Sequence, residues 1–115
     1  MKMNQDIKKL WVDALRSGKY QQAEGALRIS DGYCCLGVLC EVLKIPKQTQ
    51  QGSNVYQYGR LKATTMLPIE ACNLSRLGPQ RNPLIKYLEV HTGLSYVNDK
   101  HVSFNDIANL IEEQL

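Results

Sequence analysis

The residues of this chain best suited to covalent chemistry are two adjacent cysteines, Cys34 and Cys35. They stand where an expected strand becomes an expected helix, and the dipole at a helix N-terminus stabilises a thiolate and lowers the pKa of its thiol. Papain-like and transglutaminase-like hydrolases place their nucleophile in this way and add a histidine base that a polar group orients. A hydrolase centred on Cys34 would draw on His91 and Asp99 further along the chain.

The competing interpretation of the cysteines is structural, because a free cysteine is among the residues most often buried. Zinc sites usually bring spaced pairs of ligands, and the adjacent Cys34 and Cys35 do not fit that spacing. Cytosolic cysteines also stay reduced. We therefore predict buried thiols, no metal and no cofactor. The four cysteines are Cys34, Cys35, Cys40 and Cys72.

A second candidate site is the basic middle of the chain. Residues 44–86 carry seven Lys and Arg against one Glu, whereas residues 87–115 carry one against five acidic residues. Basic side chains interleaved with tyrosines are typical of surfaces that bind nucleic acid or small anions. The candidate residues are Tyr56, Tyr58, Arg60, Lys62, Arg76, Arg81 and Lys86, with Asn98 and Asp99 beyond the segment.

Alternatively, this segment is an ordinary solvated surface, and the acidic residues of the C-terminal segment 87–115 partly neutralise its charge. The isoelectric point of about 8.7 falls short of the usual footprint of a nucleic-acid-binding domain. The tyrosines of this segment also fit half-buried strand positions. Both interpretations stay open at the level of sequence.

Three helices are predicted to position these residues. Apolar residues at helical spacing mark a helix over residues 4–17, with Asn4 as its N-cap and Gly18 at its end. Residues 36–45 are apolar nearly all round, which indicates a buried central helix. Ser103 begins a capping sequence for a last helix over residues 103–115.

The remaining elements are short. Asp31-Gly32 predicts a tight hairpin turn, because this pair favours the positive φ angles that such a turn needs. Residues 84–90 are strand-like, and Pro68 begins a short helix that Gly78-Pro79 ends. The residues predicted to be nearly buried are Trp11, Leu15, Leu36, Leu39, Leu43, Ile107 and Ile111.

Length and composition set the class. A chain of 115 residues has the size of one domain, and 43% apolar with 22% charged residues is ordinary for a globular protein. The N-terminus lacks the apolar core of a signal peptide, and the longest apolar run, residues 34–40, is too short to span a bilayer. We expect one α+β domain, residues 1–115, in the cytoplasm. Its buried central helix is flanked by the N- and C-terminal helices, and the hairpin and residues 84–90 form a small antiparallel sheet.

Several motifs of the chain are similar to those of a known family. They are WVDALRSGKY at residues 11–20, GALR at 25–28, YCCLGVLC at 33–40, Asn98-Asp99, and the C-terminal segment 102–108. Together they resemble a family of small proteins that tailed bacteriophages and prophages encode. The resemblance implies a phage setting and a single domain, and it implies no particular chemistry.

The leading hypothesis is a non-enzymatic phage or prophage accessory protein that binds and modulates a host or defence component in the cytoplasm of the infected cell. The first alternative is a binder of nucleotides, other small anions or nucleic acid through residues 55–86. The second is a cysteine hydrolase that uses Cys34. The sequence names neither the partner nor the oligomeric state.

Overall fold

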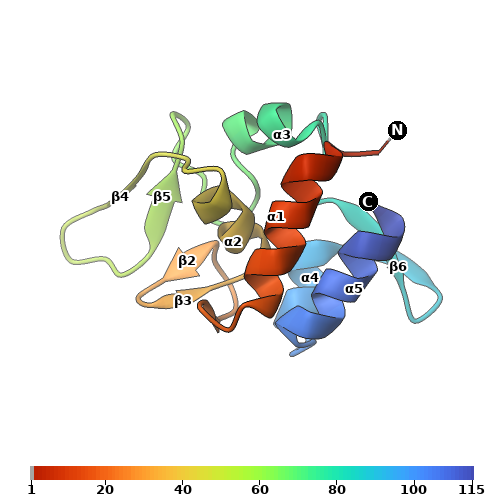
Figure 1. Cartoon of the computed structure of the whole chain (residues 1–115). Coiled ribbons are helices and arrows are strands. Elements are labelled where there is room, and N and C mark those ends of the chain that lie inside the picture. Colours follow the sequence, from red (N-terminus) through yellow and green to blue (C-terminus); the bar gives the residue numbers. More distant parts are fainter. Residues whose placement is uncertain (1) are drawn as a thin grey trace.

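Three helices form the framework of the protein, as the sequence predicts. The computed structural model describes residues 2–115. Helix α1 (Gln5–Arg16) lies beside helix α5 (Phe104–Gln114), and helix α2 (Cys35–Val42) packs against α1 (Figure 1). The predicted α+β class is confirmed.

The predicted helix starts are also confirmed. The Asn4 side chain accepts a hydrogen bond from the backbone N–H of Ile7, and the Ser103 hydroxyl accepts one from Asp106. These bonds satisfy N–H groups that have no partner within the helix. Gly18 follows α1 with a φ of 77°, the left-handed conformation expected of a residue that ends a helix.

Helix α2 is the centre of the core. Every residue from Cys34 to Cys40 is buried, and the indole N–H of Trp11 donates to the carbonyl of Cys35 at 2.9 Å. Gly37 allows α2 to lie directly on the preceding loop, because a Cβ at this position would overlap the carbonyl oxygen of Leu27. The glycine inside an otherwise apolar helix is therefore a packing requirement.

Helix α2 ends earlier than residue 45, so the predicted range 36–45 is wrong at its C-terminal end. Lys44 takes a left-handed conformation with a φ of 56°, which stops the helix before Pro46 does. Leu43 is consequently half-buried rather than nearly buried, while Ile45 turns back into the core. The other six residues of the predicted core are confirmed as buried.

A three-stranded sheet precedes α2. Strand β3 (Gly32–Tyr33) lies between β1 (Gln21–Gln22), to which it is parallel, and β2 (Arg28–Ile29), to which it is antiparallel. The two turn residues are Ser30 and Asp31, one position earlier than predicted, and Ser30 supplies the positive φ of 52°. Gly32 belongs to the strand, where a Cβ would press on the side chain of Ala23.

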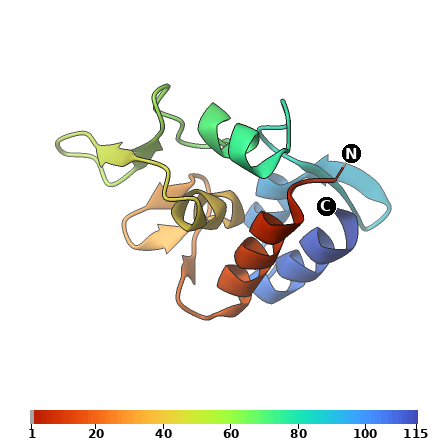
Figure 2. The same ribbon diagram turned by 45° about the horizontal axis from the view of Figure 1, so that its top comes forward.

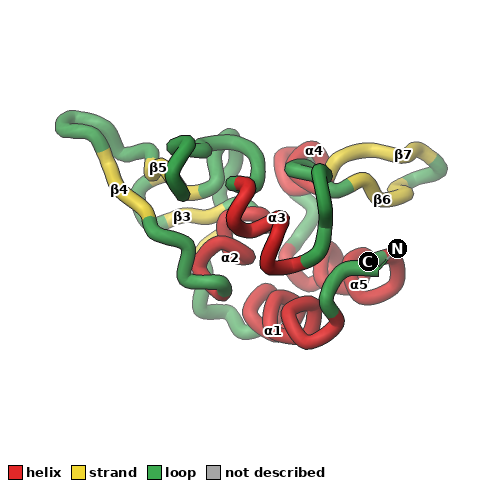
Figure 3. The backbone as a smooth tube through the Cα atoms, turned by 90° about the horizontal axis from the view of Figure 1, so that it is seen from above, coloured by secondary structure: helices red, strands yellow, loops and turns green. Residues whose placement is uncertain are grey.

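Two further hairpins project from opposite ends of the molecule, which measures 41 × 27 × 25 Å (Figures 1 and 3). One pairs β4 (Lys47–Thr49) with β5 (Tyr56–Tyr58). The other pairs β6 (Leu84–Tyr87) with β7 (Val90–Gly93) in a sheet of its own. The prediction of one strand over residues 84–90 that joins the first hairpin is therefore wrong. Helix α3 (Ile69–Ser75) lies between them in the chain, and α4 (Leu94–Asp99) follows β7 directly.

The two ends of the described chain meet. The backbone N–H of Met3 donates to the carbonyl of Leu115 at 3.3 Å, and Figure 2 shows the termini side by side. Among residues 2–115, no helix has both the length and the apolar character that a membrane crossing requires.

Asn98 of α4 joins three parts of the fold through its buried side chain. Its Oδ1 accepts hydrogen bonds from the backbone N–H of Cys35 at 3.1 Å and from the Gln22 amide at 3.0 Å. Its Nδ2 donates to the carbonyl of Ala23 at 2.8 Å and to Asp99 Oδ1 at 3.3 Å. Both donor hydrogens and both acceptor lone pairs of the Asn98 amide thus have partners. Through Asn98, α4 also supplies a hydrogen-bond partner for the first N–H of α2.

Replacement of Asn98 by alanine should destabilise the protein by about 3 kcal/mol or more, because it leaves several buried polar groups without partners. Urea unfolding measures the change. Asn109→Ala is the matched control, since the Asn109 amide pairs with Arg16 on an exposed surface and should contribute under about 1 kcal/mol. Equal losses in the two variants would contradict the role given to Asn98.

Candidate functional site

Cys34 is the N-cap of α2, where its Sγ accepts a hydrogen bond from the Gly37 N–H at 3.4 Å. The side chain is almost fully buried, and this burial raises the pKa of the Cys34 thiol to about 11. The backbone hydrogen bonds at the helix start act in the opposite direction but are the smaller effect. Cys34 is therefore a neutral thiol at pH 7.

The proposed partners of Cys34 are not all brought to it. Asp99 and Cys34 line one pocket of about 170 Å³, together with Ser95. His91 lies on β7 opposite Lys86 and does not line this pocket. Within residues 2–115 no hydrogen bond joins Cys34 to a histidine. Among the described residues, the cysteine–histidine hydrogen bond on which the hydrolase hypothesis depends is therefore absent.

The other cysteines are also free and buried. The Cys35 thiol lies 3.7 Å from the carbonyl oxygen of Leu94, and burial raises the pKa values of both Cys35 and Cys40. Burial raises the pKa of Cys72 as well. The prediction of buried cysteines is confirmed. Across residues 2–115, no three His, Cys, Asp or Glu side chains form a group that could hold a metal ion.

The basic residues of the middle segment do not gather in one place. Arg60 and Lys62 line a pocket of about 240 Å³ near β4 and β5. Arg76 ends α3 in a left-handed conformation, and Arg81 donates from Nε to the carbonyl of Leu67. Lys86 lies on β6, in the hairpin at the other end of the molecule (Figure 1). Arg60 and Lys62 therefore share a pocket, and Lys86 lies far from it.

Two of the predicted binding residues serve the framework. Tyr58 is fully buried and its hydroxyl donates to Glu41 at 2.7 Å, so its ring is closed to a stacking base. Burial raises its pKa, and the neighbouring Glu41 carboxylate adds to the shift. Asn98 is buried in the network described above. Tyr56 is half-buried, and the Arg28 guanidinium lies 4.0 Å from its ring centre.

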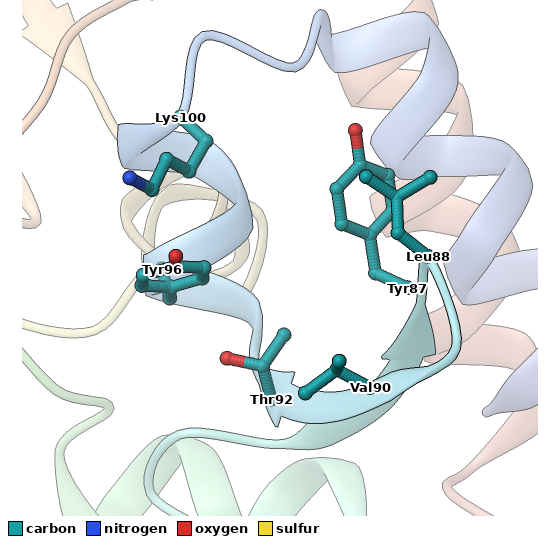
Figure 4. Close-up of a pocket in the computed structure, with 6 residues that line it drawn as sticks. All are labelled: Tyr87, Leu88, Val90, Thr92, Tyr96 and Lys100. Atoms are coloured by element: carbon teal, nitrogen blue, oxygen red, sulfur yellow. The ribbon is translucent and has the colours of Figure 1, made fainter.

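An exposed groove that the sequence did not predict lies between the β6–β7 hairpin and α4. Its volume is about 500 Å³. Its lining residues are Tyr87, Leu88, Val90, Thr92, Tyr96 and Lys100. Figure 4 shows Tyr96 and Lys100 of the α4 region on one side, Tyr87 and Leu88 on the other, and Val90 and Thr92 between them. The groove is mainly apolar and has one ammonium group at its edge.

Strand alternation and helix spacing build the two walls. Tyr87 is the cross-strand partner of Val90, and Thr92 lies two residues further along β7 on the same face. Tyr96 and Lys100 are four residues apart and therefore lie on one side of α4, with the Lys100 ammonium 5.1 Å from the Tyr96 ring centre. The opposite side of α4 carries the buried Asn98.

The tip of the hairpin exposes a large apolar side chain on a strained backbone. Leu88 and Glu89 form its two-residue turn with φ angles of 51° and 69°, and Leu88 is 78% exposed. Such turns favour Asn and Gly, because a left-handed conformation costs other residues roughly 1–2 kcal/mol. Because this turn contains neither Asn nor Gly, the sequence predicted one strand over residues 84–90 instead of a hairpin.

The fold and the groove define a small α+β domain with an exposed, mainly apolar groove at one end. The chain belongs to the family described as a domain of unknown function, DUF8296, whose family model matches residues 3–115. No curated protein and no solved structure matches the chain. The family match spans both the framework and the groove.

Burial of Cys34 should make the stability fall at alkaline pH. The folded pKa is raised above the ordinary thiol value of about 8.5, so this contribution is complete below that pH and is lost as the pH rises towards 11. Between pH 8.5 and 10.5, the free energy of unfolding of the wild type should fall more steeply than that of Cys34→Ser, by up to about 1.4 kcal/mol per pH unit. Urea unfolding under reducing conditions measures both slopes, and equal slopes would show that Cys34 ionises as easily in the folded as in the unfolded protein.

Relief of the turn strain should make Leu88→Asn more stable than the wild type by about 1 kcal/mol, because Asn adopts the left-handed conformation readily. Leu61→Asn is the matched control, since Leu61 is 74% exposed and has no left-handed backbone. Its stability should stay within about 0.5 kcal/mol of the wild type. Chemical unfolding of the three proteins gives the comparison, and a less stable Leu88→Asn variant would contradict it.

Proposed function

We propose that this chain is a non-enzymatic accessory protein of a bacteriophage or prophage that binds and modulates a host or defence protein in the cytoplasm of the infected cell. The groove between the β6–β7 hairpin and α4 is the contact surface. The observation that carries the proposal is the exposed apolar lining: Leu88, Val90 and Tyr96 are 78%, 61% and 52% exposed.

Concentration of apolar side chains around a groove supports a binding role. Single exposed apolar residues are ordinary on protein surfaces, whereas contiguous apolar patches mark interaction sites. Leu88 is also held at the tip of a strained turn, and strain of this kind gathers at functional positions. The phage setting comes from the sequence resemblance alone, through the motifs at both ends of the chain.

The state of the cysteines favours binding over catalysis. Burial keeps Cys34 protonated, and the negative charge of Asp99, which lines the same pocket, raises the pKa of the thiol further. A nucleophilic cysteine needs the reverse environment, with a positive group or a base beside the thiol. The environment of Cys34 therefore supports a structural role for this cysteine and a non-enzymatic role for the chain.

The test is capture of a partner from infected host cells with the tagged full chain, followed by titration of the purified partner. Leu88→Asn and Tyr96→Ala change opposite walls of the groove and should each weaken binding by about tenfold or more, as expected for apolar residues at the centre of an interface. Leu61→Asn, an equally exposed leucine outside the groove, should leave the affinity unchanged.

Two results would contradict the proposal. A captured partner that binds all three variants as tightly as the wild type would place the interface elsewhere. Turnover of a substrate by the wild type that is lost in Cys34→Ser would show that the chain is an enzyme. Thermal unfolding of each variant confirms that a loss of affinity is not a loss of fold.

A further inference from the structure

We infer that the groove binds an extended peptide segment, which pairs with the outer edge of β7 and places an acidic side chain beside Lys100; the inference rests on the proposed function and names its binding mode. Three observations carry it. They are the unequal edges of the β6–β7 hairpin, the face on which the groove lies, and the unpaired charge of Lys100.

Hairpin geometry determines which backbone groups point outward. Tyr87 and Val90 flank the two-residue turn, so they form a hydrogen-bonded pair, and the next pair, Lys86 and His91, directs its N–H and C=O groups away from the hairpin. On the β6 side, one side chain of α5 forms hydrogen bonds with both outward groups of Lys86. The Lys86 N–H donates to Gln114 Oε1 at 2.7 Å, and Gln114 Nε2 donates to the Lys86 carbonyl at 2.9 Å.

The opposite edge has no such cover. His91 is exposed, and within residues 2–115 no side chain takes the position at its backbone that Gln114 takes at Lys86. An open edge of this kind is a template for another strand, whose main chain would complete the hydrogen bonds. The hairpin thus has one edge closed by an amide and one edge free at β7.

The groove lies where the side chains of an added strand would point. Side chains of an extended peptide alternate between the two faces of a sheet, so every second one would share the face of Val90 and Thr92. That face forms the groove, whose other wall is Tyr96 and Lys100. Apolar side chains of the peptide would fill the space of about 500 Å³.

Lys100 supplies the charge preference. Its ammonium contacts the Tyr96 ring, and it forms no ion pair with an acidic group of residues 2–115. Among the described residues that line the groove, Lys100 is the only charged one. A carboxylate on the peptide would meet this ammonium at a partly apolar site, where an opposite charge is favoured and a second cation is repelled.

Fluorescent decapeptide pools test the inference by anisotropy. In all pools, Val, Ile or Tyr alternates with Ser or Thr. The first pool carries one Asp, and the second carries Lys in its place. The third is the Asp pool with N-methyl groups on the backbone nitrogens of alternate residues. The wild type should bind the Asp pool at least tenfold more tightly than the Lys pool, and N-methylation on the pairing edge should weaken binding by a similar factor.

Variants of the protein sharpen the result. Lys100→Glu should reverse the preference between the Asp and Lys pools. His91→Pro removes the outward N–H of β7 and should weaken binding of the Asp pool; an edge strand tolerates proline at such a position. If this variant fails to fold, the N-methylated pool tests the same hydrogen bonds. Lys86→Glu, a charge change on the covered edge, should leave the preference as it is.

The outcomes separate this inference from the proposed function. No binding of any pool, equal binding of the Asp and Lys pools, or binding unaffected by N-methylation would overturn the peptide mode. So would dimerisation of the free chain that His91→Pro abolishes, because a second copy would then occupy the edge. If Leu88→Asn still weakens binding of the captured host protein in these cases, the proposed function stands without the strand pairing.

Discussion

The buried amide of Asn98 is the interaction on which the rest of the structure depends. It lies at the meeting point of α4, the start of α2 and the residues around β1, three segments far apart in the chain. Buried polar groups are costly unless every donor and acceptor has a partner, and here each one has. The same junction receives the indole of Trp11, so the C=O of Cys35 is bonded from α1 and its N–H is bonded from α4.

This anchor also gives the exposed end of the protein its shape. Helix α4 is only six residues long, yet it carries Asn98 inward and Tyr96 outward, with Lys100 just beyond its end. A helix so short has little stability of its own, and its position comes from packing and from the Asn98 network. The groove is therefore formed by a fixed helix on one side and a strained hairpin tip on the other. Cys34 belongs to the fixed part, because burial keeps its thiol neutral and the hydrogen bond from the Gly37 N–H holds its side chain at the start of α2.

The sequence predicted those parts of the fold that local patterns determine. The three main helices, the N-caps of the first and the last of them, and six of seven core residues follow from apolar spacing and polar residues at helix starts. The β6–β7 hairpin was missed because Leu88-Glu89 is an unfavourable turn sequence, and the contacts of β6 with α5, which sequence patterns do not reveal, help to hold the hairpin in place. The groove was missed for the same reason, since its walls meet only once the hairpin and α4 are placed. The basic residues fall within one segment of the sequence, but Arg60 and Lys62 lie at one end of the molecule and Lys86 lies at the other, which charge counting does not reveal.

The most direct test of the account is the position of the contact surface. Amide chemical shifts of the isotopically labelled chain can be followed while the captured host protein is added. Shifts concentrated on residues 87–100, with little change around Arg60, Lys62 and Cys34, are the predicted result. Shifts centred on Arg60 and Lys62, or on the pocket of Cys34 and Asp99, with residues 87–100 unchanged, would contradict it.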